Sequence, residues 1–157
     1  MKRIQDIVLA HEEVQGIHDM MVHDYGPGRR LVSLHAEVPG DYDIFQIHDV
    51  IDHIERELNE KLSCEAVIHM DPIETNNEEV AKMKRIMEEK VKEIDAQMTI
   101  HDFRMVSGPT HTNLIFDAVM PYELKMSKNE VRQEIERIVE NLEGNYFAVV
   151  QIDQSYV

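Results

Sequence analysis

The sequence has 157 residues and an apolar fraction of 43%, which is normal for a globular protein and argues against disorder. Acidic residues outnumber basic ones by 31 to 16, so the formal net charge is −15 at pH 7, and we expect no nucleic-acid partner because phosphate binding needs basic patches. The single cysteine, Cys64, cannot form a disulfide within the chain, and no stretch reaches the roughly 20 apolar residues of a membrane span, so we expect a cytoplasmic chain that does not insert into a membrane.

The first half of the chain alternates between helical and strand patterns. Ile47, Ile51 and Ile54 recur at intervals of three and four, which is typical of an amphipathic helix. Val32 and Leu34 alternate with polar residues, which is typical of a half-buried strand. The predicted elements, in chain order, are a helix over 2–14 ended by Gly16, strands over 17–23 and 31–38, a helix over 44–62 and a strand over 65–70.

The same order of elements returns in the second half. The predicted elements are a helix over 80–94, strands over 99–106 and 113–120, a helix that begins near Ser127, and a strand over 146–152. Ser127 and Glu130 have the spacing of a capping box, in which each residue satisfies a backbone N–H at the start of a helix. The polar segment 74–78 joins the two halves.

A repeat relates the two halves residue by residue. Ile17-His18-Asp19 corresponds to Ile100-His101-Asp102, and Gly26-Pro27 corresponds to Gly108-Pro109. The glycine–proline pairs lie 82 residues apart and the histidines 83 apart, so we place a one-residue deletion in the first strand of the second copy. A period this long indicates a duplicated module rather than a solenoid.

We therefore predict an α/β (α+β) fold of two tandem α-β-β-α-β, ferredoxin-like modules over residues 1–74 and 75–157. Each module is expected to hold a three-stranded mixed sheet with two helices on one face, which leaves the other face partly open. The alternation of residues predicts that His35, His69 and Asp71 lie on that open face of the first module.

Histidines concentrate in the first module. The chain has nine, of which six lie between His11 and His53, and histidine is the commonest metal ligand. The residues on neighbouring elements that are candidates to converge on an ion are His18, His35, His48, His69 and Asp71. Imidazole with carboxylate suits zinc, and also iron, manganese, cobalt or cadmium. Five ligands exceed the four of a tetrahedral ion, which allows two ions that share a bridging group.

The other histidines have simpler interpretations. His11, His23, His53 and His111 are expected to be solvated surface residues. His53 is the strongest rival ligand, because Asp49 lies four residues before it on the same helix face.

Five segments of the first module carry a resemblance to a known family. They are Val14-Gln15-Gly16-Ile17-His18-Asp19, Gly26-Pro27, Leu34-His35-Ala36-Glu37-Val38, Gln46-Ile47-His48 and Val67-Ile68-His69-Met70-Asp71-Pro72. In this order, over about residues 3–73, the chain resembles the cytosolic C-terminal domain of cation diffusion facilitator (cation efflux) transporters. The resemblance implies a metallochaperone-like fold, bound Zn²⁺ or a similar ion, a homodimer, and coupling of cytosolic metal to the transmembrane domain of the same transporter. It also implies that the metal ligands are His18, His35, His48, His69 and Asp71.

The chain departs from the family in two respects. The second copy extends beyond the usual single domain, and in place of the first copy's ligands it carries His101, Asp117, Gln151 and Asp153. We expect this copy to be structural, or to form at most a weak metal site from His101, Asp117 and Asp153. A pairing of the two copies within one chain would compete with the homodimer. The transmembrane domain is missing from this sequence, so we expect either a fragment of a transporter or a free-standing relative.

Three rival functions stay open at the level of sequence. The first is a free-standing metal buffer or chaperone, and the second is a purely structural dimerisation module with incidental histidines. The third is a metallohydrolase, for which Glu37 or Asp19 would be the general base. No HExxH, nucleophile elbow or P-loop is present, so we predict that the protein is not an enzyme.

Overall fold

The computed structural model describes residues 1–156 and confirms two α-β-β-α-β modules. The first module contains α1 (Lys2–Leu9), β1 (Gly16–Asp24), β2 (Arg30–Pro39), α2 (Ile44–Leu62) and β3 (Cys64–Ile73). The second module contains α3 (Asn77–Val91), β4 (Thr99–Ser107), β5 (Thr112–Met120), α4 (Lys128–Glu140) and β6 (Tyr146–Gln154). The chain divides into one compact unit over Met1–Thr75 and a second that begins at Asn76.

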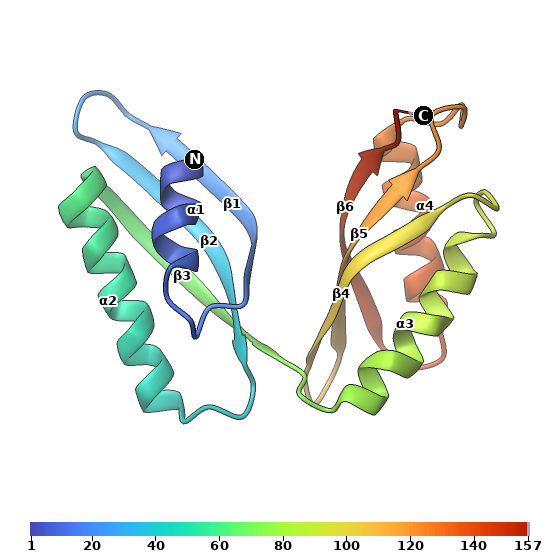
Figure 1. The fold of residues 1–157 in the computed structure, drawn as a ribbon, viewed down its shortest axis with the longest axis horizontal. Helices are drawn as coiled ribbons and strands as arrows, with labels where there is room; N and C mark the ends of the chain where they lie inside the picture. The colour runs from blue at the N-terminus through green and yellow to red at the C-terminus, as the bar shows by residue number, and fades with distance from the viewer. Residues whose placement is uncertain (157) are drawn as a thin grey trace. The chain divides into compact units, whose positions relative to one another are not determined.

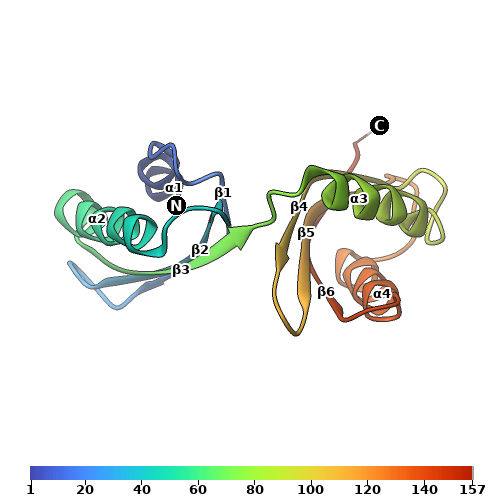
Figure 2. The same cartoon turned by 90° about the horizontal axis from the view of Figure 1, so that it is seen from below.

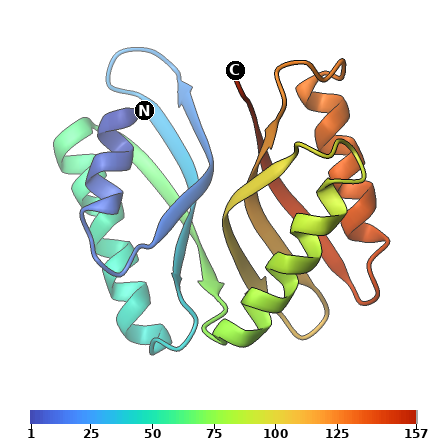
Figure 3. The ribbon, with the colours of Figure 1, turned by 45° about the vertical axis from the view of Figure 1, so that its right-hand side comes forward.

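Each module is built from one mixed sheet and one layer of helices. The strand orders are β1-β2-β3 and β4-β5-β6, with an antiparallel hairpin followed by a parallel third strand. Figures 1 and 2 show α1 and α2 on one face of the first sheet, and Figure 3 shows α3 and α4 on one face of the second. Within residues 1–156, the opposite face of each sheet carries no helix of its own module, as predicted.

Both modules have a separate apolar core between sheet and helices. The largest fully buried side chains of the first core include Leu34 from the sheet and Ile54 and Leu58 from α2. The second core is built around Phe116 of β5, with Ile135 of α4 packed in the same cluster. The alternation in β2 and the three-and-four spacing in α2 therefore point their apolar residues toward one shared layer.

Local residues cap the ends of the helices. Asp43 caps α2 by accepting a hydrogen bond from the backbone N–H of Gln46 at 3.1 Å, and Ser63 ends the helix in the left-handed conformation at φ 53°. The capping box predicted for α4 is present, since the N–H of Glu130 donates to Ser127 Oγ at 3.1 Å and the Glu130 carboxylate accepts from the Ser127 N–H at 3.4 Å.

Two details of the sequence-based prediction are wrong. The first helix ends at Leu9 rather than near Gly16, because the chain turns so that Val14 is buried and the N–H of Gln15 donates to the Glu37 carbonyl oxygen at 2.8 Å. The one-residue deletion lies in the hairpin turn and not in the strand. Five residues, 25–29, join β1 to β2, whereas four residues, 108–111, join β4 to β5, and the two first strands match throughout.

We predict that Ile54→Ala destabilises the first module by about 2–5 kcal/mol, because Ile54 is fully buried and its truncation leaves a cavity in the core. Ile44→Ala, a matched change on the exposed start of the same helix, should stay within about 0.5 kcal/mol of the wild type. Native-state hydrogen exchange of the β2 amides measures the free energy of opening in each variant. Equal effects of the two substitutions would contradict the assigned core.

Candidate metal centre

Three histidines form a row across the open face of the first sheet. The register pairs His18 of β1 with His35 of β2, and His35 with His69 of β3, so the three residues lie directly opposite one another. The ring centroids of His18 and His35 are 4.7 Å apart, and those of His35 and His69 are 4.6 Å apart. Strand pairing alone therefore brings together three imidazoles that are distant in sequence.

The carboxylate of Asp71 lies at the centre of this row. Its Oδ2 is 3.0 Å from Nε2 of His18 and 2.9 Å from Nδ1 of His35, while its Oδ1 is 3.1 Å from Nε2 of His69. His18, His35 and Asp71 each offer one ligand atom, and these atoms lie within 4.8 Å of one another. Nitrogen and carboxylate oxygen ligands of this kind bind zinc at about 2.0–2.2 Å, so the donor set fits a divalent transition-metal ion.

A second carboxylate lies beneath the row. Glu37 is only 2% exposed, and its Oε2 is 2.9 Å from Nδ1 of His18. The register pairs Glu37 with Asp71 on one side and with Gly16 on the other. The two ring nitrogens of His18 therefore face two different carboxylates, both of them buried.

A β-bulge in β1 adjusts the direction of the chain next to the row. The pairing shifts by one residue between His18 and Met21, and Asp19 adopts a left-handed conformation at φ 50°, which aspartate tolerates better than most residues. Beyond the bulge, a hollow of about 510 Å³ opens on the surface and includes His35 and His69 among its lining residues. The centre is therefore accessible to solvent from this side.

The protonation of His18 and the ionisation of the carboxylates next to it favour one another. Burial of the His18 ring disfavours its charged form, but the hydrogen bonds to Asp71 and Glu37 outweigh burial and raise the pKa of His18 to about 9. Burial likewise opposes ionisation of Asp71, but the hydrogen bonds from His18 and His35 outweigh it and hold the pKa of Asp71 below its ordinary value. Without a metal ion, a proton on His18 thus supplies the positive charge between the two carboxylates.

Four of the five predicted ligands are brought together, and His48 is not among them. His48 lies exposed on α2, outside the group of converging ligand atoms that residues 1–156 contain. Asp49 and His53, the alternative pair of ligands, are exposed and in contact, with His53 Nε2 3.3 Å from Asp49 Oδ2. His11 is half-buried rather than freely solvated, because its Nε2 lies 2.9 Å from Glu57 Oε2.

Glu37 is the residue of this centre that sequence reasoning missed as a partner of the ligands. From the sequence, Glu37 is a candidate only for the general base of a hydrolase. Its position two residues after His35 on the same strand was the available signal, because residues i and i+2 point to the same face of a sheet.

The second module repeats the geometry of the strands without the ligand cluster. His101 pairs with Asp117, Asp117 pairs with Gln151, and Asp102 has the same left-handed conformation, at φ 55°, as its counterpart in the first module. Burial, and then the neighbouring charge of Asp102, raise the pKa of Asp117. Within residues 1–156, the converging group of ligand atoms lies in the first module, so the weak site predicted from His101, Asp117 and Asp153 stays a prediction.

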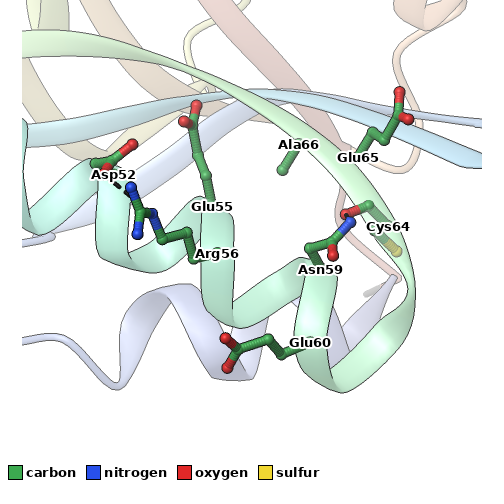
Figure 4. A pocket seen from close by; sticks show the side chains of 8 residues that line it. All are labelled: Asp52, Glu55, Arg56, Asn59, Glu60, Cys64, Glu65 and Ala66. Atoms are coloured by element: carbon green, nitrogen blue, oxygen red, sulfur yellow. Dashed lines mark hydrogen bonds and ion pairs between the residues drawn. The ribbon is translucent and has the colours of Figure 1, made fainter.

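Another hollow, of about 330 Å³, lies between α2 and the edge strand β3 (Figure 4). Its polar groups already bind one another: Arg56 Nε lies 3.3 Å from Asp52 Oδ2, and Asn59 donates to the carbonyl oxygen of Cys64 at 3.3 Å. Nearby, Glu55 accepts a hydrogen bond from the N–H of Ile68 at 2.9 Å. The hydrogen bonds of Asn59 and Glu55 cover backbone groups at the edge of the sheet, and Cys64 is buried.

The imidazole and carboxylate ligands gathered on one face of the first sheet make the first module a candidate metal-binding domain. Residues 1–73, which make up the first module, match the family model described as "Cation efflux protein, cytoplasmic domain". This match agrees, over the first module, with the resemblance to the cytosolic domain of cation efflux transporters that the sequence carries.

Curated relatives match the same part of the chain. Protein p34 of Rickettsia prowazekii (strain Madrid E) and the cation-efflux pump FieF of Salmonella newport (strain SL254) are each 31% identical over 72 residues. These alignments cover 45% of this chain and 24% of each relative. The chain thus spans about a quarter of the length of these relatives, and among residues 1–156 no helix is both long and apolar enough to cross a membrane.

Solved structures match over a similar length. A chain described as a candidate zinc transporter, CzrB, is 27% identical with a TM-score of 0.42, and covers 45% of this chain and 89% of that chain. The metal-bound C-terminal domain of the CzcD transporter from Thermotoga maritima is 17% identical with a TM-score of 0.41, and covers 44% of this chain and 81% of that chain.

We predict that the metal-free first module loses stability as the pH rises from about 6.5 to 9. The pKa of His18 is raised by folding from 6.5 to about 9, so its stabilising contribution is complete below the lower value and disappears above the higher one. Urea unfolding in the presence of a chelator, followed by NMR signals of the first module, measures this dependence.

His18→Gln is the matched control, because it keeps a polar side chain that does not titrate. The wild type should lose stability over this pH range relative to the variant. The same slope in both proteins would assign the effect to the overall negative charge and contradict the role of His18.

Proposed function

We propose that the first module binds a divalent transition-metal ion, zinc in the first place, through His18, His35, His69 and Asp71. The observation that supports this proposal is the convergence of His18, His35 and Asp71 from three different strands on one point of an open sheet face. The donor atoms suit zinc, and iron, manganese, cobalt or cadmium are the alternatives.

We further propose that Asp71 bridges two ions. Its two oxygens have different neighbours, since Oδ2 is close to His18 and His35 whereas Oδ1 is close to His69. A carboxylate in this situation is able to give one oxygen to each of two ions. The second ion would need further ligands, because one imidazole and one carboxylate oxygen do not complete a coordination shell.

A homodimer would supply such ligands. His48 lies on the first turns of α2 beside Ile44 and Phe45, and Phe45 is 83% exposed. Exposed apolar side chains that gather in one place are typical of interaction surfaces. The matched family model is also named for a dimer. We propose that two copies associate near this turn and that His48 becomes a ligand only in the dimer.

The proposed role is sensing of cytosolic metal for a divalent-cation efflux transporter. Binding shifts the balance between two arrangements of a dimer only as far as the ion binds one arrangement better than the other. A tenfold preference corresponds to about 1.4 kcal/mol, which is enough for a graded response. The transmembrane domain of the same transporter would be the partner that reads this change. A free-standing metal buffer or chaperone is the second candidate, since it would use the same site.

We predict that metal-free protein, titrated with zinc against a competing chelator, binds one or two ions tightly per chain and that His35→Ala and His69→Ala each abolish this binding. Both variants remove an imidazole next to Asp71. His101→Ala is the matched control in the second module, because its side chain lies at the equivalent place without a converging ligand set.

Weak or undefined binding that neither variant changes would contradict the proposed function. The chain would then be a structural dimerisation module with incidental histidines. A loss of the tight ion in His101→Ala would instead move the site to the second module.

We also predict that zinc affinity falls when the pH is lowered from 7.5 to 5. Protons compete with the metal for the imidazole nitrogens, so binding should weaken below about pH 6. The same chelator competition, repeated at both pH values and corrected for protonation of the chelator, measures this effect. Equal affinities at the two pH values would rule out ligation by histidine.

A further inference from the structure

We propose that Glu37 is a positioning residue of the metal centre, which holds the proton of the neutral His18 ring on Nδ1 and thereby directs the Nε2 lone pair toward Asp71. This inference rests on the proposed function of the site. It assigns a role to a buried carboxylate that is not among the predicted ligands.

The contacts of His18 support this assignment. Its Nδ1 lies 2.9 Å from Oε2 of Glu37, whereas its Nε2 lies 3.0 Å from Oδ2 of Asp71. When the ring is neutral it carries one proton, and both of its nitrogens face a carboxylate. Oδ2 of Asp71 is also 2.9 Å from Nδ1 of His35, so Asp71 has a second imidazole donor, and we place the His18 proton on the nitrogen next to Glu37. The lone pair of Nε2 is then available to coordinate an ion. Histidine ligands commonly have a carboxylate on the far nitrogen for this reason.

The backbone next to Glu37 leaves room for its carboxylate. Gly16 pairs with Glu37 across the sheet, and a Cβ atom at Gly16 would lie 2.9 Å from Oε1 and 3.1 Å from Cδ of Glu37. Real Cβ atoms essentially never come within 3.0 Å of another heavy atom, so a side chain at position 16 would require the Glu37 carboxylate to shift. Gly16 therefore leaves the Glu37 carboxylate room for the position from which it contacts His18.

The second module is an internal comparison. The register places Thr99 and Val119 at the positions that Gly16 and Glu37 occupy in the first module. In the second module Thr99 Oγ1 lies 3.5 Å from Nε2 of His101. The glycine and the buried carboxylate thus occur together in the module whose ligand atoms converge, and both are replaced in the other.

The test uses the full chain and three substitutions. Glu37→Val introduces the residue of the second module and removes the acceptor, whereas Glu37→Gln removes the charge and keeps an oxygen that accepts a hydrogen bond. Glu65→Gln is the control, because Glu65 is an exposed residue of β3. Amide NMR spectra first establish that each variant is folded.

The first measurement is the tautomer of His18 in metal-free protein at pH 10, by long-range ¹H–¹⁵N NMR. We expect the Nδ1–H form in the wild type, in Glu37→Gln and in Glu65→Gln, and a loss of its dominance in Glu37→Val. The second measurement is the zinc affinity, which should fall roughly 10–100-fold in Glu37→Val and be largely restored in Glu37→Gln.

Wild-type tautomer and affinity in Glu37→Val would overturn the proposal. Equal losses of affinity in Glu37→Val and Glu37→Gln would also overturn it, since charge rather than proton placement would then explain the effect. If the wild type binds no zinc, the proposed function fails, but the tautomer in the metal-free protein still decides whether Glu37 orients His18.

Discussion

Two buried carboxylates on an otherwise open sheet face are the constraint on which the centre depends. Glu37 and Asp71 are 2% and 7% exposed and lie opposite each other on adjacent strands. Buried negative charges are costly unless a positive charge and hydrogen bonds compensate them. His18 lies between the two and meets this need as an imidazolium, which is the physical reason for its raised pKa. A divalent cation would meet the same need more completely, so the fold holds a place for positive charge before any metal binds.

The second module illustrates that the fold itself does not need this arrangement. Val119 stands in the place of Glu37, and Gln151 in the place of His69, while strand order, register and the bulge are kept. Its stability comes from the core around Phe116. Asp117 stands in the place of His35, and burial and the neighbouring charge of Asp102 raise its pKa although Arg104 acts in the opposite direction. Because the two modules have separate cores, the first can contain the buried carboxylates of the candidate metal centre while the second has the same fold without them.

Much of the structure was predictable because periodicity reports directly on which face a residue occupies. The alternation in β2 predicted that His35 lies on the open face, and the repeat predicted both sheets. The role of Glu37 was not predictable in this way, since nothing local indicates that a carboxylate on an open face is buried by its neighbours. The early end of α1 was missed because a contact with β2, from Gln15 to Glu37, overrides the helical pattern. The exposure of His48 is likewise a property of packing and not of spacing.

The position of His48 also bears on how an ion would act as a signal. His18, His35 and His69 lie on three strands that backbone hydrogen bonds already hold in register. An ion bound by this row alone would stabilise one rigid sheet. It would bind two arrangements of the protein with similar affinity and so would not shift the balance between them. His48 is the one predicted ligand on a helix, so it is the one through which binding would join the sheet to a second layer or a second copy. In the proposed function, sensing would therefore require His48, whereas simple storage of metal would need only the row.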